Sequence, residues 1–282
     1  GSVLALLVFL PILAAVNVSV ESGAATTTYP WTMFHHNLNH TGYTSSRAPR
    51  IPTLMWTYLT GGMVYSSPAV VDGMVFIGSY DNNRTYALNQ STGALIWSYT
   101  LGGRVEWSSP AVAYGKVFIG SWDGRIYALN QVTGALIWSY TTGAAVYSSP
   151  AVAYGKVFIG SGDSKVYALN QLTGALVWNY TTGSPYVYGS PAVADGIVFI
   201  GSGDKVLYAL NQSTGVPVWK YTTGNYVYSS PAVADGMVFV GSLDSRVYAF
   251  APTHDVAIAD MKMPDSATVG DNVTINVLVS NT

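Results

Sequence analysis

Hydrophobic and polar positions follow a recurring order along residues 54–250. Each period holds four runs of strand length that are rich in Val, Ile, Tyr and Phe, as in SSPAVVDG, MVFIGSYD, RTYALNQ and ALIWSYT. Asp-Gly or Tyr-Gly separates the first run from the second, and Thr-Gly separates the third from the fourth. The pattern therefore predicts sheets of four short antiparallel strands.

The period has a nearly fixed length. The proline of a Ser-Pro-Ala-Val unit recurs at spacings of 42, 40, 41 and 40 residues. Four antiparallel strands in such a period describe one blade of a β-propeller. The second run of each period is apolar on both faces, as expected where neighbouring blades cover both sides of a sheet. We therefore predict an all-β, five-bladed propeller over residues 52–250, with one tryptophan packed between each pair of blades: Trp56, Trp97, Trp138, Trp178 and Trp219.

The phase of the repeat predicts how the ring closes. The last period reaches Phe250 without a fourth, tryptophan-bearing run, whereas residues 54–58 form such a run with no first three before it. Pairing the Trp56 strand with the last blade would remove an exposed sheet edge. We expect this N-terminal strand to complete the fifth blade. A larger ring, or one completed by assembly, is the alternative.

Composition and charge exclude several classes of function. The 282 residues carry a formal net charge of -2 with no basic cluster, which argues against nucleic acid as a partner. The absence of Cys excludes disulfides, thiol nucleophiles and Cys-ligated metals. Glutamate occurs only as Glu21 and Glu106, so the predicted propeller holds a single glutamate.

The residues before the repeat indicate export. Residues 3–16 form an apolar run that is short for a membrane span and typical of the core of a secretion signal. We expect residues 1–30 to be this signal, or an apolar membrane anchor where it is retained, and the protein to be extracellular at a cell surface. The sequence has the character of a fragment at both ends. Seven Asn-x-Ser/Thr sites could carry glycans in an exported protein.

Four copies of one motif carry a family resemblance. The form Ala-Leu-Asn-Gln-x-Thr-Gly followed by Trp four residues later occurs at 87–97, 128–138, 168–178 and 209–219. It resembles the tryptophan-docking motif of pyrroloquinoline-quinone-type propeller repeats, in which Asp stands where this chain has Asn. Residues 31–51, with WTMFHH and HTGY, are similar to the stretch that often precedes the first repeat, which implies that they pack on the propeller.

The resemblance implies the fold more strongly than the function. The family includes quinone-dependent alcohol and sugar dehydrogenases, an outer-membrane assembly scaffold and surface proteins without assigned activity. Residues 251–282 resemble a linker and the opening strands of an adhesion-related immunoglobulin-like domain of archaeal surfaces. In the quinone enzymes the resemblance implies an adjacent cysteine pair, a calcium-ligating Glu and usually eight blades. This chain has no Cys and five repeats, so we predict no cofactor and no enzyme activity.

Two sets of polar residues have both a structural and a ligand-binding interpretation. His35, His36 and His40 could bind a metal if they were helical, but the Asn and Gly around them favour a loop with a packing role and no metal. An Asp in the second turn of each blade, with a cation close behind it, could bind calcium or a cationic ligand. Capping of the turn, with local charge compensation, is favoured for these residues: Asp81, Asp123, Asp163, Asp204 and Asp244, with Arg84, Arg125, Lys165, Lys205 and Arg246.

An aromatic residue precedes the Ser-Pro unit of every blade, and this connection lies on the same face as the Asp-bearing turn. Rings and polar groups together suit a sugar, and plugging of the channel by tyrosines is the alternative. The first two blades depart from the repeat, which favours one ligand site there. Glu106 with Asp123 is conceivable as a glycosidase acid/base pair. The candidate ligand-binding residues are Tyr65, Tyr80, Arg104, Glu106, Trp107, Trp122, Asp123, Tyr147, Tyr188 and Tyr228.

The sequence thus predicts a non-catalytic binding or scaffold propeller on a cell surface, with a surface glycan or a surface protein as partner. The alternative is a structural subunit of a surface layer or extracellular filament, formed by self-assembly. A hydrolase of surface polysaccharide is the third interpretation. Contact with a membrane is expected only through the N-terminal apolar segment.

Overall fold

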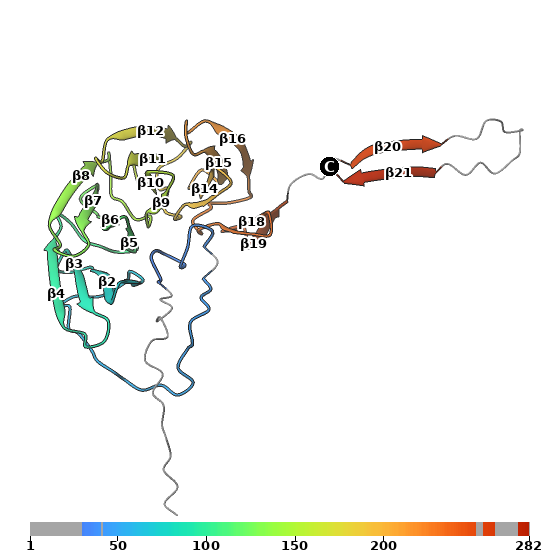
Figure 1. Cartoon of the computed structure of the whole chain (residues 1–282). Coiled ribbons are helices and arrows are strands. Elements are labelled where there is room, and N and C mark those ends of the chain that lie inside the picture. The colour runs from blue at the N-terminus through green and yellow to red at the C-terminus, as the bar shows by residue number, and fades with distance from the viewer. Residues whose placement is uncertain (1–29, 41, 252–255, 263–275, 282) are drawn as a thin grey trace, which may run out of the picture.

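The computed structural model describes residues 30–40 and 42–251, together with the strands β20 (Val256–Lys262) and β21 (Asn276–Asn281) (Figure 1). The predicted signal or anchor, and most of the predicted linker and immunoglobulin-like segment, lie outside these residues. β20 and β21 pair as an antiparallel two-stranded sheet. Within the described ranges no helix occurs that could cross a membrane.

Residues 69–250 form five antiparallel sheets, which confirms the predicted all-β repeat (Figure 1). Each sheet keeps the chain order of its strands from the inside of the arc to the outside. Innermost strands of successive sheets contact each other, so the blades follow one another around a common centre. The strands are β1 (Ala69–Val71), β2 (Met74–Ser79), β3 (Arg84–Asn89) and β4 (Leu95–Thr100) in blade 1; β5 (Ala111–Ala113), β6 (Lys116–Gly120), β7 (Arg125–Asn130) and β8 (Leu136–Thr141) in blade 2; β9 (Ala151–Ala153), β10 (Lys156–Gly160), β11 (Lys165–Asn170) and β12 (Leu176–Thr181) in blade 3; β13 (Ala192–Ala194), β14 (Ile197–Gly201), β15 (Val206–Asn211) and β16 (Pro217–Thr222) in blade 4; and β17 (Ala232–Ala234), β18 (Met237–Ser242) and β19 (Arg246–Phe250) in blade 5.

The turn between the third and fourth strands explains the Asn of the repeated motif. In blade 2, Oδ1 of Asn130 accepts hydrogen bonds from the backbone N–H groups of Val132 and Thr133, both at 2.9 Å. The other three complete blades have the same pair of bonds. The turn uses only the side-chain oxygen, which Asn supplies as well as Asp does.

The tryptophans of blades 1, 2 and 3 each dock on the next blade. Nε1 of Trp97 donates to the carbonyl oxygen of Gln131 at 2.9 Å, and its ring lies against Gly134. A Cβ on Gly134 would come within 2.5 Å of that ring, so the contact itself requires glycine. Trp138 and Trp178 repeat the arrangement on blades 3 and 4. Together with the apolar second strands, these rings build the core between blades.

Trp56 docks on blade 1 in the same way as a fourth strand of a preceding blade would. Its Nε1 donates to the carbonyl oxygen of Gln90 at 3.0 Å, and a Cβ on Gly93 would lie 2.6 Å from its ring. Oγ1 of Thr60 donates to the carbonyl oxygen of Gly62 at 2.7 Å, just as Thr142 does to Ala144 after β8. The predicted closing strand therefore contacts blade 1 through Trp56 and Thr60 as the fourth strand of a preceding blade would.

The predicted pairing of this segment with the last blade is not formed. Blade 5 is a three-stranded sheet of β17, β18 and β19, and Figure 1 shows the arc open between blade 5 and blade 1. We call this opening the seam. Both sides of the seam expose apolar side chains, since Val247 on β19 is 79% exposed and Leu59 in the Trp56 segment is 91% exposed. Closure of the ring thus stays a prediction. The repeat forms five sheets, and the fifth lacks its fourth strand.

Residues 31–40 cross the centre of the arc and bond to the inner strands. Trp31 pairs with Val70 of blade 1. Val112, Val193 and Val233, in blades 2, 4 and 5, donate their N–H groups to carbonyl oxygens of Thr32, Leu38 and Asn39 at 2.6–2.9 Å. The second residue of each inner strand would otherwise present an unpaired edge N–H. We call residues 31–40 the plug, and it links both sides of the seam.

Candidate functional site

Five aromatic side chains, one before the inner strand of each blade, line a single cavity of about 510 Å³. Serines of the Ser-Pro units share its wall, and Phe34 of the plug contributes a further ring. The position before each inner strand brings the rings together because all inner strands meet at the centre of the arc. We call these five residues the aromatic mouth: Tyr65, Trp107, Tyr147, Tyr188 and Tyr228.

The rings of the mouth touch one another but leave part of the surface open. Ring centroids of Tyr147 and Tyr188 lie 4.7 Å apart, and those of Tyr188 and Tyr228 lie 5.0 Å apart. Trp107 lies 5.5 Å from Tyr147, yet it is 51% exposed, as is Tyr65. The predicted plugging by tyrosines is therefore only partial, because the rings also border a cavity and reach solvent.

Hydrogen bonds between serines hold the blades at a regular spacing behind the mouth. The backbone N–H of one serine donates to Oγ of its equivalent on the next blade at 2.8–3.0 Å, four times in succession. We call this chain the serine belt, and it runs through Ser67, Ser109, Ser149, Ser190 and Ser230. The serine before each repeated proline was the sequence signal for this belt, but its hydrogen bonds between blades were not predicted.

The unusual residues of the first two blades join the mouth at one side. Arg104 donates from Nη1 to the hydroxyl of Tyr80 at 2.6 Å, and its guanidinium carbon lies 4.6 Å from the centre of that ring. The same guanidinium carbon lies 5.4 Å from the ring centre of Trp122. Tyr80 contacts Tyr65, and Trp122 contacts Tyr147, so this cation–π cluster continues directly into the mouth.

Glu106 supplies a negative charge to the mouth without a hydrogen-bond partner of its own. Its Oε2 is buried and accepts no hydrogen bond from any described residue. Burial, followed by the charge of Glu106, raises the pKa of Tyr147. Burial first, then Tyr147 and other neighbours including Glu106, raise the pKa of Tyr188 to about 12. These two phenols therefore stay neutral at ordinary pH, and the carboxylate acts on both rings.

Asp123 is held by hydrogen bonds within its own blade, whereas Glu106 is not, and the acid/base pair of the two stays a hypothesis. The hydroxyl of Tyr127 donates to Oδ2 of Asp123, and the N–H of Arg125 donates to its Oδ1 at 3.1 Å. Burial and this bond raise the pKa of Tyr127 to about 12. Asp123 therefore stabilises the turn of blade 2.

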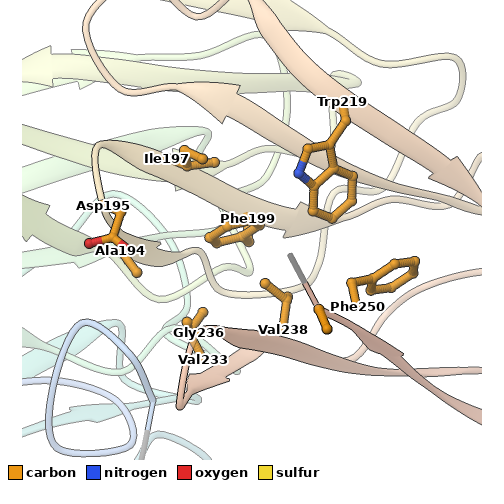
Figure 2. Close-up of a pocket in the computed structure, with 10 residues that line it drawn as sticks. Ala194, Asp195, Ile197, Phe199, Trp219, Val233, Gly236, Val238 and Phe250 are labelled. Carbon is orange, nitrogen blue, oxygen red and sulfur yellow. The ribbon is translucent and has the colours of Figure 1, made fainter. Parts of the chain in front are cut away.

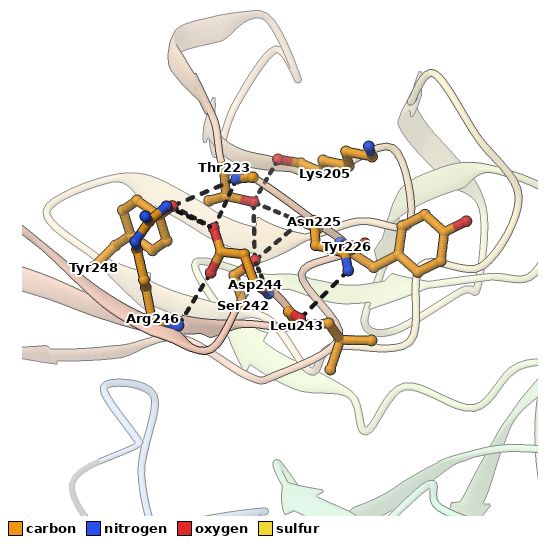
Figure 3. Close-up of polar contacts among 10 residues, drawn as sticks. Lys205, Thr223, Asn225, Tyr226, Ser242, Leu243, Asp244, Arg246 and Tyr248 are labelled. Carbon is orange, nitrogen blue, oxygen red and sulfur yellow. Dashed lines mark hydrogen bonds and ion pairs between the residues drawn. The ribbon is translucent and has the colours of Figure 1, made fainter.

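The other repeated aspartates also serve the fold. In blade 5 the hydroxyl of Tyr248 and the N–H of Gly224 donate to Oδ2 of Asp244 at 2.5 and 2.8 Å (Figure 3). Asp163 and Asp204 have equivalent bonds, which tie each turn to the loop after the preceding blade. The predicted capping is confirmed, because Oδ1 accepts the backbone N–H two residues later in Asp123, Asp163, Asp204 and Asp244. Within the described part of the chain, only Asp244 also lies within ion-pair distance of its nearby cation, Arg246, at 3.8 Å. In the other blades, backbone N–H groups and tyrosine hydroxyls stabilise the carboxylate in place of an ion pair.

The three histidines lie in the plug with left-handed backbone and not in a helix. His40 is buried, and its neutral ring donates from Nδ1 to the carbonyl oxygen of Pro231 in blade 5 at 2.8 Å. Burial lowers the pKa of His40 to about 4. Across the described ranges no three His, Cys, Asp or Glu side chains are grouped as a metal site.

A second cavity, of about 480 Å³, lies between blades 4 and 5 (Figure 2). Its wall includes Trp219, Phe199, Val238 and Phe250. Trp219 is the repeat tryptophan whose following blade, blade 5, lacks a fourth strand. No described residue accepts a hydrogen bond from Nε1 of Trp219. The cavity therefore occupies the place where the other tryptophans meet a glycine turn.

Tyr186, Tyr226 and Phe34 extend the aromatic surface beyond the residues expected from the sequence. Tyr186 and Tyr226 lie 5.2 and 5.4 Å, centroid to centroid, from Tyr188 and Tyr228. Their signal is the Tyr-Val-Tyr pattern before the last two Ser-Pro units.

Comparison with known protein families identifies the family of the repeat. A model described as "Outer membrane protein assembly factor BamB" matches residues 31–185 and 184–256. The chain belongs to this family. The match ends at the propeller, so the predicted immunoglobulin-like segment has no support from it and stays a prediction. No curated protein shows significant sequence similarity to the chain.

Solved structures of the same type include proteins of different function. BamB from Moraxella catarrhalis has a TM-score of 0.62 and 24% identity, over 70% of this chain and 61% of that one. A quinohemoprotein alcohol dehydrogenase from Comamonas testosteroni has a TM-score of 0.63 and 21% identity, over 83% of this chain and 51% of that one. The chain spans about half to three fifths of these relatives. At such identities the likeness shows the propeller-type fold alone, so it does not decide between scaffold and enzyme.

Proposed function

We propose that this chain is a non-catalytic binding and scaffold propeller of the cell envelope, and that the aromatic mouth contacts its partner. The observation that carries the proposal is the mouth itself: accessible rings around a cavity of about 510 Å³. Rings that combine stacking faces with polar edges suit ligands held by stacking and by hydrogen bonds. The carboxylates that a hydrolase would need are committed to turns, except Glu106.

Envelope location and partner class are inferred from family and sequence together. The family's description names an assembly factor for outer membrane proteins, and the chain begins with an apolar run typical of export. An extracellular surface glycan or a surface protein is therefore the proposed partner.

We further propose that the seam closes when residues 54–59 pair with β19. Trp56 and Thr60 already have the relation to blade 1 that a fourth strand has to the next blade. In blade 4, Val206 lies opposite Thr222 and Ala209 opposite Trp219. The same register in blade 5 places Arg246 opposite Leu59 and Ala249 opposite Trp56. Closure would cover the exposed edge of β19 and fill the cavity beside Trp219.

A glycan array, followed by heat denaturation with each binding sugar, tests the proposed function. We expect binding that raises the melting temperature and that Trp107→Ala abolishes. Tyr114→Asn is the matched control, since it removes an exposed ring from the β5–β6 turn at the far end of blade 2 and tolerates the left-handed backbone there. Absence of binding at millimolar sugar, together with no effect of Trp107→Ala on capture of a surface protein, would contradict the proposal.

A structural subunit of a layer or filament is the second candidate, and the seam is the observation that favours it. The open edge of β19 and the exposed Trp56 segment are complementary, so the segment of one copy could complete blade 5 of the next. Electron microscopy of the native material checks this, and isolated particles at high concentration would count against it.

A further inference from the structure

The negative charge of Glu106 and the ring faces of the mouth act on the same region. Glu106 precedes Trp107 in the chain, and its charge raises the pKa of Tyr147 and Tyr188, two rings of the mouth. Its Oε2 has neither a hydrogen-bond donor nor an ion pair among residues that the structure describes. A half-buried carboxylate left without a donor is costly unless a cation or a bound group compensates it.

The rings also favour a cation. Aromatic faces carry negative potential, and several rings around one space recognise alkylammonium groups through it. Tyr147, Tyr188 and Trp107 lie within 6 Å of one another, centroid to centroid, at steep or tilted angles, so faces and edges both border the cavity. The hydroxyls of Tyr147 and Tyr188 stay protonated, so these two rings carry no charge of their own.

The chain itself shows a cation on the neighbouring rings. The guanidinium of Arg104 lies over Tyr80 and Trp122, and the hydroxyl of Tyr80 holds it there. No ion pair joins Arg104 to Glu106 in the described part of the chain. One half of the aromatic surface thus has its cation, whereas the half beside Glu106 has the rings and the carboxylate without one.

We propose that the aromatic mouth binds an organic ammonium group on its Trp107, Tyr147 and Tyr188 side, with Glu106 as the counter-charge. This inference rests on the proposed function, since it names the chemistry that enters the same mouth. It distinguishes a cationic group from the neutral sugar that stacking alone would accept. The cavity, of about 510 Å³, is large enough for a choline-sized cation.

Calorimetric titration of the whole chain with two pairs of probes tests the proposal. Choline is compared with 3,3-dimethylbutan-1-ol, its neutral isostere, and glucosamine is compared with glucose. We expect choline to bind with a dissociation constant near or below about 1 mM, and the isostere to bind at least about tenfold more weakly. Glucosamine binding without choline binding would support an ammonium group carried by a sugar.

Glu106→Gln is the decisive variant, and Asp235→Asn is its matched control. Both changes remove one negative charge and keep the side chain's size, but Asp235 lies in the exposed β17–β18 turn at the other end of blade 5's inner strand. Asn also tolerates the positive φ at this position. We expect Glu106→Gln to weaken choline binding at least about tenfold, with the isostere unaffected, and Asp235→Asn to leave both unchanged.

Equal affinity for the charged and neutral members of both pairs would overturn the proposal, as would choline binding that Glu106→Gln leaves intact. The absence of choline and glucosamine binding up to roughly 50 mM would also overturn the proposal, since a specific site would have a lower dissociation constant than that. Binding of neutral glycans or of a surface protein in that case would leave the proposed function standing. The two failures are therefore distinguishable.

Discussion

The junction between blades 2 and 3 and the junction between blades 4 and 5 hold the same kind of tryptophan in two different states. Trp138 is 8% exposed, bonds to the carbonyl oxygen of Gln171 and rests on Gly174. Trp219 is half-buried beside a cavity of about 480 Å³ and contacts Phe199 and Phe250. The glycine turn of the following blade thus completes the site of Trp138, whereas the site of Trp219 beside the three-stranded blade 5 is incomplete.

Alanine substitution of the two tryptophans gives the largest effect and tests this comparison. Trp138→Ala should lower the free energy of unfolding by about 3–5 kcal/mol, because it leaves a large cavity in a covered junction. If the seam closes as proposed, Trp219→Ala should cost a similar amount. Urea denaturation of both variants provides the measurement, and a cost for Trp219→Ala of less than half that for Trp138→Ala would argue for a seam that stays open.

Glycine substitutions separate ring contact from backbone strain. Gly174→Ala introduces both, since φ is +72° and the new Cβ would lie 2.6 Å from the Trp138 ring. Gly115→Ala is the control, with φ +69° and open space around the new Cβ. We expect about 1–2 kcal/mol of destabilisation for Gly115→Ala and at least about 3 kcal/mol for Gly174→Ala, by urea denaturation.

Gly93→Ala extends this series to the Trp56 segment. A Cβ there would meet the Trp56 ring at 2.6 Å, as in the interior junctions. A cost equal to that of Gly174→Ala would show that Trp56 is held as firmly as Trp138, whereas a cost equal to that of Gly115→Ala would show a loosely docked segment.

The pH dependence of stability reports on the plug, which links both sides of the seam. Burial lowers the pKa of His40 to about 4, below its ordinary value of 6.5. The unfolded chain therefore binds more protons between these pH values, so stability is full above pH 6.5 and falls as the pH drops toward 4. The loss should reach up to about 3 kcal/mol in the wild type, and His40→Asn should remove that part of the pH dependence. Denaturation across pH 4–8 measures it, and identical slopes for both proteins would contradict the role given to His40.

Serine substitutions give the smallest effect. Ser149→Ala removes the acceptor for the Ser109 N–H and should cost about 1 kcal/mol. Ser67 is the first serine of the belt, and its Oγ would accept from the Ser230 N–H only in a closed ring. Ser67→Ala should therefore also cost about 1 kcal/mol if the seam closes, and nothing measurable if it does not.

The repeat could be predicted from the sequence because each blade repeats the same local rules. Apolar runs, glycine turns and one tryptophan per period define the strands and predict a tryptophan between neighbouring blades, as is found for Trp97. The positions of Tyr65, Trp107 and Tyr147 around one centre followed from the same repetition. Closure could not be settled in this way, because it depends on contacts between residues almost 200 positions apart in the chain.

The details of the site were less predictable because they depend on which donor reaches which acceptor. Capping by Asp123 was predicted and is formed, but the hydrogen bond from the hydroxyl of Tyr127 to the same carboxylate was not predicted. The hydrogen bonds of the serine belt depend on how adjacent inner strands are aligned with each other, which no local pattern encodes. The unpaired Oε2 of Glu106 likewise emerges only from the packing around it.

A designed disulfide across the seam tests whether the Trp56 segment closes the ring. The chain has no Cys, so Leu59→Cys with Arg246→Cys places two thiols opposite each other in the register proposed for closure. Lys165→Cys with Thr181→Cys is the positive control, because these residues are paired in blade 3. Leu59→Cys with Lys165→Cys is the negative control.

Non-reducing electrophoresis and peptide mass mapping after mild oxidation provide the readout. We expect a disulfide within one chain for the seam pair, formed about as fully as in the positive control. No bond at the seam where the positive control forms, or a bond only between two chains, would contradict closure of the ring by its own Trp56 segment.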